Sequence, residues 1–161
     1  MQAGEVEIDE TYFTGSKRLG DERKQGVTKN KRAVIGSVER GGRVVARYVG
    51  ATANLRDASD HLNTYVLPEA VVFSDEWPGY SENALAGRVH HRVKHAARVY
   101  VDGNVHTQAI DGFWSLLKRG IGGTYHSVSE RYLQNYIDEY AFRYNHRDDS
   151  RAMFFAFLGN I

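Results

Sequence analysis

Apolar and polar residues alternate over the first third of the chain, which is the pattern of half-buried β-strands. The alternation predicts strands over residues 5–13, 33–39 and 43–49. Gly41 and Gly42 stand between the second and third of these segments and are typical of a short hairpin connection. The simplest arrangement of the three predicted strands is a meander.

The middle of the chain combines a helix with a buried strand. Asn54, with Asp57 three residues later, has the spacing of a helix N-terminus, and the helix that begins there is expected to end near Pro68. The apolar run at 70–75 ends in an acid and predicts a buried strand flanked by a crossover helix. Two further elements are predicted beyond it, a short helix over 81–86 and a strand, or pair of strands, over 88–101.

The last third of the chain is predicted to be helical. Helical periodicity runs over 107–119 and again over 129–147, and a glycine-rich stretch at 120–123 predicts a break between the two helices. Ser127 and Glu130 have the spacing of a capping box for the second helix. The apolar stripe of that helix comprises Tyr132, Leu133, Tyr136, Ile137, Tyr140, Ala141 and Tyr144.

The order of these elements predicts an α/β fold in which helices pack on the faces of a mixed sheet. The chain has 161 residues, of which 42% are hydrophobic and 25% charged, and no segment has the composition of a linker. A single domain over residues 1–161 is therefore expected.

Composition narrows the chemistry that the chain can perform. The absence of cysteine excludes disulfides and thiolate zinc sites, so any metal would be held by carboxylates, histidines or backbone oxygens. Such ligands favour a hard divalent cation. No run approaches the roughly 18 apolar residues of a membrane-spanning helix, and the first ten residues lack the pattern of a signal peptide, so we expect a cytoplasmic protein.

Basic residues are concentrated in two segments, although the formal net charge is only +1. Each segment taken alone could be a solvated loop or an exposed strand. Two of them in one small domain favour a track for a nucleic-acid backbone. The candidate DNA-binding residues in these segments are Lys17, Arg18, Lys29, Lys31, Arg32, Arg92 and Lys94.

Three acids lie where a site is expected. Asp9 lies near the end of the first predicted strand, Asp75 at the end of the buried strand, and Asp111 in the first turn of the helix over 107–119. Ligands of open sheets collect beyond strand ends, so Asp9 and Asp75 converge if their strands are neighbours. Converging carboxylates repel one another unless a cation lies between them. By spacing alone, Asp9 and Asp75 are equally well explained as ordinary surface acids.

Helical geometry divides the helix over 107–119 into two faces. The apolar face is expected to be buried and comprises Ile110, Phe113, Trp114, Leu117 and Ile121. The opposite face carries Gln108, Asp111, Ser115, Lys118 and Arg119. It would present an acid to a metal and cations to a DNA backbone, with Gln108 and the preceding His106 as candidates to line the site. A capping or core role is equally compatible with His106.

Five motifs follow one another along the chain. In chain order they are EIDETY at 7–12, SDEWPGY at 74–80, HTQAIDGFWSLLKRG at 106–120, GTYH at 123–126 and YAFRYN at 140–145. Each motif alone is a weak signal, whereas their order and spacing together are specific and resemble the DDE transposases of bacterial insertion sequences, of the ISXO-like group. The resemblance extends over residues 5–147, essentially the whole chain.

The resemblance implies a ribonuclease H-like fold, as in retroviral integrases, with a mixed five-stranded sheet. Asp9, Asp75 and Asp111 match the three catalytic, metal-binding acids, and Lys118 matches a family lysine beyond the third acid. Such enzymes use two Mg²⁺ ions, for which Mn²⁺ can substitute, to activate the attacking water or 3′-hydroxyl and to stabilise the leaving oxygen. The implied reactions are cleavage at the element's ends and strand transfer into target double-stranded DNA, by a homodimer or larger assembly.

Two features depart from the family pattern. The third family residue is usually Glu, or is replaced by a nearby Asn, whereas here Asp111 and Gln108 occupy those positions. Asp is shorter than Glu by one methylene, about 1.5 Å, so its helix has to lie closer to the sheet. Full-length relatives carry an N-terminal DNA-recognition module, and because Met1 lies so close to Asp9 we expect a catalytic domain alone, as in a truncated copy.

Two other functions fit the same residues. One is a catalytically inactive, truncated transposase remnant that only binds DNA. The other is a ribonuclease or junction resolvase on the same fold, because a fold alone does not define its reaction. The segment from Phe113 to Arg119 resembles the transposases more than those nucleases and favours the transposase.

Overall fold

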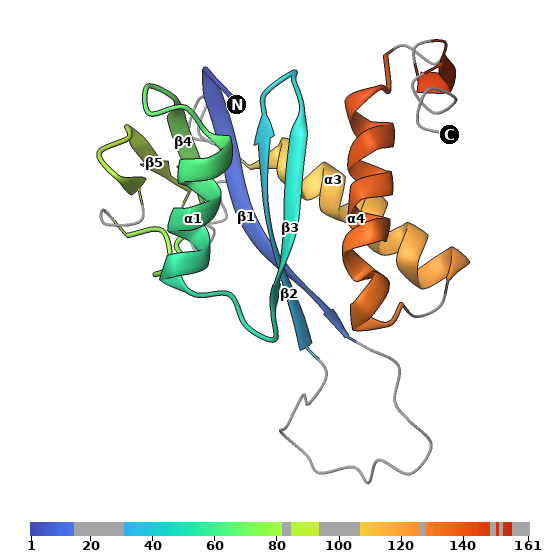
Figure 1. Ribbon diagram of the computed structural model, residues 1–161. Coiled ribbons are helices and arrows are strands. Elements are labelled where there is room, and N and C mark those ends of the chain that lie inside the picture. Colours follow the sequence, from blue (N-terminus) through green and yellow to red (C-terminus); the bar gives the residue numbers. More distant parts are fainter. Residues whose placement is uncertain are drawn as a thin grey trace, which may run out of the picture.

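A mixed five-stranded sheet is the centre of the computed structural model, which describes residues 1–14, 31–81, 85–93, 107–125, 128–148, 151 and 153–155. The strands lie in the order β3-β2-β1-β4-β5 (Figure 1). Neighbouring strands β1, β2 and β3 are antiparallel, whereas β4 is parallel to both β1 and β5. The elements are β1 Glu5–Thr14, β2 Lys31–Glu39, β3 Val44–Gly50, α1 Leu55–Tyr65, β4 Val71–Ser74, β5 His90–Arg92, α3 Gln108–Arg119 and α4 Glu130–Asn145.

This order confirms the predicted meander and the ribonuclease H-like sheet with flanking helices. The strand expected over 88–101 is present as β5, and residues 94–101 lie outside the described part of the chain. Of the short helix expected over 81–86, only Leu85 is described as helical, and 82–84 are outside the description. None of the described helices has the length and apolar character needed to cross a membrane.

The pairing of β1 decides where the site forms. β1 pairs with β2 from Val6 to Thr14, but with β4 only through its first three residues. Asp9 is therefore in the middle of its strand. The prediction that it lies near the end of the strand was wrong, because β1 continues to Thr14 beside β2. β4 has already ended at Ser74, so Asp9 still lies beyond the end of a neighbouring strand. Glu7 pairs with Phe73. Two residues farther along both segments, Asp9 lies level with Asp75.

Helices cover both faces of the sheet, with α1 on one face and α3 and α4 on the other (Figure 1). Successive residues of a strand point to opposite faces, so β1 contributes to both layers. Val6 and Ile8 pack under α1, whereas Phe13 packs under α3 and α4. Glu7 and Asp9 share the face of Phe13 by the same alternation. Glu7 and Asp9 therefore point toward α3.

The ends of α1 agree with the sequence. The Asn54 side chain accepts hydrogen bonds from the backbone N–H groups of Arg56 and Asp57, and the Asp57 carboxylate accepts one from the Asn54 N–H. This reciprocal capping box satisfies donors that have no partner inside the helix. The buried residues Ala58, His61 and Leu62 then hold the helix against the sheet.

Helix α3 buries the face that its periodicity predicted. Its polar face is exposed to solvent. Packing of the apolar face against β1, β2 and α4 fixes the rotation of the helix about its axis. The buried residues are Ile110, Phe113, Trp114 and Leu117, and Ile121 is buried just beyond the helix.

Two details of the α3–α4 connection were predicted wrongly. The glycines do not break the chain after Arg119, because Gly120–Thr124 continues as one π-helical turn. Gly120 keeps helical angles and lies against Tyr140 of α4, where an added Cβ would overlap the phenol group. Glycine here allows close packing of the helices. Helix α4 begins at Glu130 with Ser129 as its N-cap, so Glu130 is the first helical residue and not the third, as the predicted capping box requires; Ser127 lies outside the described residues.

Candidate active site

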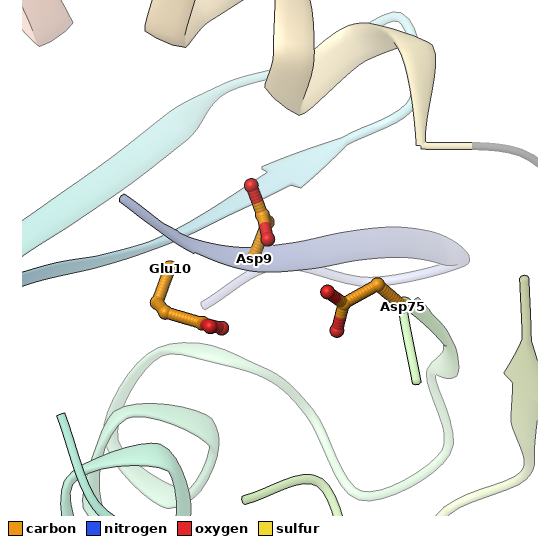
Figure 2. A group of neighbouring side chains, drawn as sticks. All are labelled: Asp9, Glu10 and Asp75. Atoms are coloured by element: carbon orange, nitrogen blue, oxygen red, sulfur yellow. The ribbon is translucent and has the colours of Figure 1, made fainter. Parts of the chain in front are cut away.

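Three carboxylates converge at the end of β4. Asp9, Glu10 and Asp75 each offer one carboxylate oxygen, and these three oxygens lie within 4.8 Å of one another (Figure 2). Asp9 and Glu10 come from β1, and Asp75 is the first residue after β4. The predicted convergence of Asp9 with Asp75 is therefore present, and it results from the parallel pairing of β1 with β4.

Asp75 is held by a local turn. Its Oδ1 accepts a 2.9 Å hydrogen bond from the backbone N–H of Trp77. This is the Asx-turn arrangement, in which an aspartate bonds to the backbone two residues ahead. The hydroxyl of the preceding Ser74 donates to the Asp75 carbonyl at 2.9 Å and lies 2.8 Å from Nε2 of His90 on β5. Asp75 is thus attached to both the turn and the sheet edge.

Asp9 is held by helix α3. The indole Nε1 of Trp114 donates a 2.8 Å hydrogen bond to Oδ2 of Asp9. Sequence periodicity placed Trp114 in the core, and its ring is indeed buried. Its N–H also orients the Asp9 carboxylate, a role that helical periodicity does not predict. A buried tryptophan N–H needs an acceptor, and an acid on the facing strand supplies one.

Glu10 is the member of the cluster that was not predicted from the sequence. It points to the face of the sheet opposite Asp9, yet its carboxylate reaches the same group because no residue of β4 pairs with β1 at this level. The hydroxyl of the fully buried Tyr80 donates to Oε2 of Glu10 at 3.1 Å. One sequence feature could have indicated Glu10. The apolar run before Asp75 is shorter than the first predicted strand, so it cannot pair along the whole of that strand.

Burial and mutual repulsion make two of these acids weak. Burial, together with the charges of Asp75 and Asp111, raises the pKa of Asp9 to about 7, against a smaller lowering by the Trp114 hydrogen bond. Burial, together with the charges of Asp75 and Asp9, raises the pKa of Glu10 to about 7. Carboxylates in this condition are stabilised in their charged form by a cation placed among them.

Asp111 lies apart from the three-acid group. It is exposed in the first turn of α3, and its Oδ2 accepts a 3.4 Å hydrogen bond from the Thr107 hydroxyl. Its charge nevertheless reaches the site, because it contributes to the raised pKa of Asp9. Gln108 is also exposed at the start of α3, and His106 lies outside the described residues. Asp111 thus acts on the charge state of Asp9 without belonging to the three-acid group.

Three of the described basic candidates form two groups, one on β5 and one on α3. Arg92 is exposed at the end of β5, where it pairs with Ser74, the residue before Asp75, and its guanidinium donates to the Tyr80 carbonyl at 3.4 Å. Lys118 and Arg119 are exposed in the last turn of α3. Arg92 therefore lies on the strand beside Asp75, and Lys118 and Arg119 lie on the helix that carries Asp111.

The remaining basic candidates lie at the far end of the β1–β2 pair or outside the description. Lys31 begins β2 with its ammonium 5.5 Å from the centre of the Tyr12 ring. Arg32 donates a hydrogen bond to the Val128 carbonyl, which anchors the segment before α4. Lys17, Arg18, Lys29 and Lys94 lie outside the described residues.

Comparison with known proteins identifies the family. A family model described as the ISXO2-like transposase domain matches residues 1–145. No curated protein and no solved structure matched the chain. The matched region contains β1 through α4, with the three clustered acids and Asp111. The chain therefore belongs to the ISXO2-like transposase domains, a family of insertion-sequence DDE transposases.

Proposed function

We propose that this chain is the catalytic domain of a transposase that cleaves DNA at the ends of an insertion sequence and transfers the strand into target DNA. The observation that carries the proposal is the convergence of Asp9 with Asp75 within a domain matched by the transposase family. The catalytic unit would be residues 1–161, and it would work on DNA in the cytoplasm.

The donor set fits a hard divalent cation. All three clustered groups are carboxylates, which suit Mg²⁺ and Mn²⁺, and the chain has no cysteine to favour a softer metal. Asp9 and Asp75 would hold the metal, with Asp111 as the third acid and Glu10 as an additional ligand. Two bound cations would activate a water or 3′-hydroxyl and neutralise charge on the phosphodiester.

The chain's own residues would orient the acids and the DNA. Trp114 holds the Asp9 carboxylate, and the Asx turn at Trp77 holds Asp75, so both ligands are fixed before a metal binds. Arg92, Lys118 and Arg119 would contact DNA phosphates around the cluster, since guanidinium and ammonium groups bind phosphate oxygens. Lys118 would act nearest the reaction, as the counterpart of the family lysine.

A wider track of cations would hold the rest of the DNA. It would comprise Lys17, Arg18, Lys29, Lys31, Arg32 and Lys94. Cleavage at two ends of one element requires two such sites, so we expect a homodimer or larger assembly on double-stranded DNA. DNA affinity should fall steeply with salt because each phosphate contact releases counterions.

The metal site can be tested without knowing the DNA ends. We expect calorimetric titration with Mn²⁺ to give saturable binding to the wild-type protein and at least a tenfold lower affinity for Asp75→Asn. Glu76→Gln is the matched control, because Glu76 is the adjacent, exposed acid and lies outside the cluster. Equal binding by wild-type protein and Asp75→Asn, or no binding by either, would contradict the proposed site.

A second candidate is a DNA-binding protein without catalysis. It is favoured by one observation, the position of Asp111 outside the three-acid group. This candidate predicts salt-sensitive DNA binding that does not respond to Mn²⁺ and survives Asp75→Asn. The catalytic proposal instead predicts Mn²⁺-dependent nicking of duplex DNA that is abolished by Asp75→Asn, with no preference for RNA–DNA hybrids.

A further inference from the structure

Glu7 is a completely buried acid two residues before Asp9. Its exposed fraction is 0%, and it lies on the same face of β1 as Asp9, toward α3. A carboxylate in such a place is unfavourable unless hydrogen bonds and opposite charge compensate it. The site chemistry described above does not use Glu7, so its compensating contacts indicate its role.

One oxygen of Glu7 caps helix α3. Oε2 accepts hydrogen bonds from the backbone N–H groups of Ala109, at 2.7 Å, and Ile110, at 3.1 Å. These donors have no partner within the helix, and they form the positive end of its dipole. Thr107, the local N-cap residue, makes no side-chain capping bond. The first turn of α3 is therefore capped from strand β1, across more than 100 positions of sequence.

The other oxygen of Glu7 is fixed by Arg40. Nε of Arg40 donates to Oε1 at 2.9 Å, and its Nη1 donates to Glu5 at 2.8 Å. The guanidinium lies 3.9 Å from the centre of the Phe73 ring on β4, two residues before Asp75. The Glu7 carboxylate thus joins the helix that carries Asp111 to β1, which carries Asp9, and through Arg40 to β4, which Asp75 directly follows.

We propose that Glu7 is a positioning residue, which sets the place of Asp111 relative to Asp9 and Asp75 by holding the first turn of α3. Asp111 directly follows the two residues whose N–H groups Glu7 binds, so a shift of that turn would displace its carboxylate. The Trp114 bond to Asp9 fixes the same helix one turn later. This inference rests on the proposed function, in which Asp111 completes the metal site.

The test compares Mn²⁺ affinity in Glu7→Gln, Asp111→Asn and the double variant of the full chain. Gln has nearly the same shape but no charge, and cannot satisfy both the helix N–H groups and Arg40 as acceptors. We expect Glu7→Gln to lower Mn²⁺ affinity about tenfold, as outer-shell substitutions at metal sites do. In the Asp111→Asn background, Glu7→Gln should change the affinity less than twofold, because the residue through which it acts is already gone.

Glu5→Gln is the matched control. Glu5 also binds Arg40, but its side chain is 41% exposed, and its charge should be dispensable for Mn²⁺ binding. Less than a twofold change is expected for it. An unchanged affinity in folded Glu7→Gln, or an equal loss with and without Asp111, would overturn the positioning role.

Hydrogen exchange of the wild-type protein tests the cap even if Glu7→Gln fails to fold. The amides of Ala109 and Ile110 should be protected from exchange, although first-turn amides normally exchange quickly. Rapid exchange of both amides, in a protein that binds Mn²⁺, would overturn the role of Glu7 alone. An absence of Mn²⁺ binding in the wild-type protein would overturn both this inference and the proposed metal site.

Discussion

Gly36 of β2 and Trp114 of α3 are in contact so close that no side chain fits between them. A Cβ on Gly36 would lie 2.5 Å from Cη2 of the indole. Gly36 is also the residue that pairs with Asp9 across the β1–β2 ladder. The glycine thus allows α3 to approach the sheet at the level where the Trp114 N–H meets Asp9.

Gly36→Ala should therefore displace Trp114 and weaken its hydrogen bond to Asp9. We expect a loss of about 1–3 kcal/mol in the free energy of unfolding, as for other insertions into packed cores, and weaker Mn²⁺ binding. Urea unfolding and Mn²⁺ calorimetry measure the two effects. Gly112→Ala is the control, because its Cβ would meet nothing within 4 Å and alanine favours a helix. Equal stability of the two variants would contradict the packing role of Gly36.

Mn²⁺ binding should strengthen between pH 6 and pH 8. The pKa values of Asp9 and Glu10 are raised to about 7, so metal binding at pH 6 has to displace protons from carboxyl groups that are largely protonated. Calorimetry at pH 6.5 in buffers of different ionisation enthalpy measures the protons released. Glu10→Gln should lower that number. A binding enthalpy independent of the buffer would contradict the raised pKa values.

Asp9→Asn should stabilise the metal-free protein at pH 8. The folded state retains the proton of Asp9 up to about pH 7, whereas the unfolded state releases it near pH 3.8, so stability decreases as pH rises through this interval. Asn avoids that loss and can still accept the Trp114 hydrogen bond. We expect a gain of at least about 1 kcal/mol by urea unfolding, which disappears at pH 4. Asp60→Asn, an exposed acid, should show no such gain.

His61 should make the fold sensitive to acid. Burial, together with the charge of Arg47, lowers the pKa of His61 to about 3, and its Nε2 lies 2.8 Å from the hydroxyl of the buried Ser37. The unfolded state takes up a proton near pH 6.5 and the folded state only near pH 3. Stability from this group is therefore complete above pH 6.5 and is lost as pH falls toward 3.

The comparison of wild-type protein with His61→Gln isolates this effect. The variant should be less stable at pH 8, because its contact with Ser37 is altered. Below pH 6.5 the difference should shrink by about 1.4 kcal/mol per pH unit, since glutamine does not titrate. Urea unfolding at pH 8, 6 and 5 checks the trend. A constant difference between the two proteins would show that His61 titrates normally in the folded state.

Local patterns in the sequence were sufficient to predict strand β1, the start of α1 and the buried face of α3. The alternation in β1, the capping box at Asn54 and the apolar stripe of α3 each depend on residues within a few positions of one another. The predicted convergence of Asp9 with Asp75 followed from their places relative to predicted strands and from the motifs around them. Interactions of this range are encoded by spacing, so they could be predicted from the sequence.

Tertiary structure decided which acids meet and what holds them. Glu10 belongs to the cluster because β4 ends early beside β1. Asp111 lies outside the cluster because of the position of α3 on the sheet. The capping of α3 by Glu7 joins residues more than 100 positions apart. Strand register, the position of α3 on the sheet and the burial of Asp9, which raises its pKa, arise only when distant segments pack together. The spacing of residues along the chain does not specify that packing.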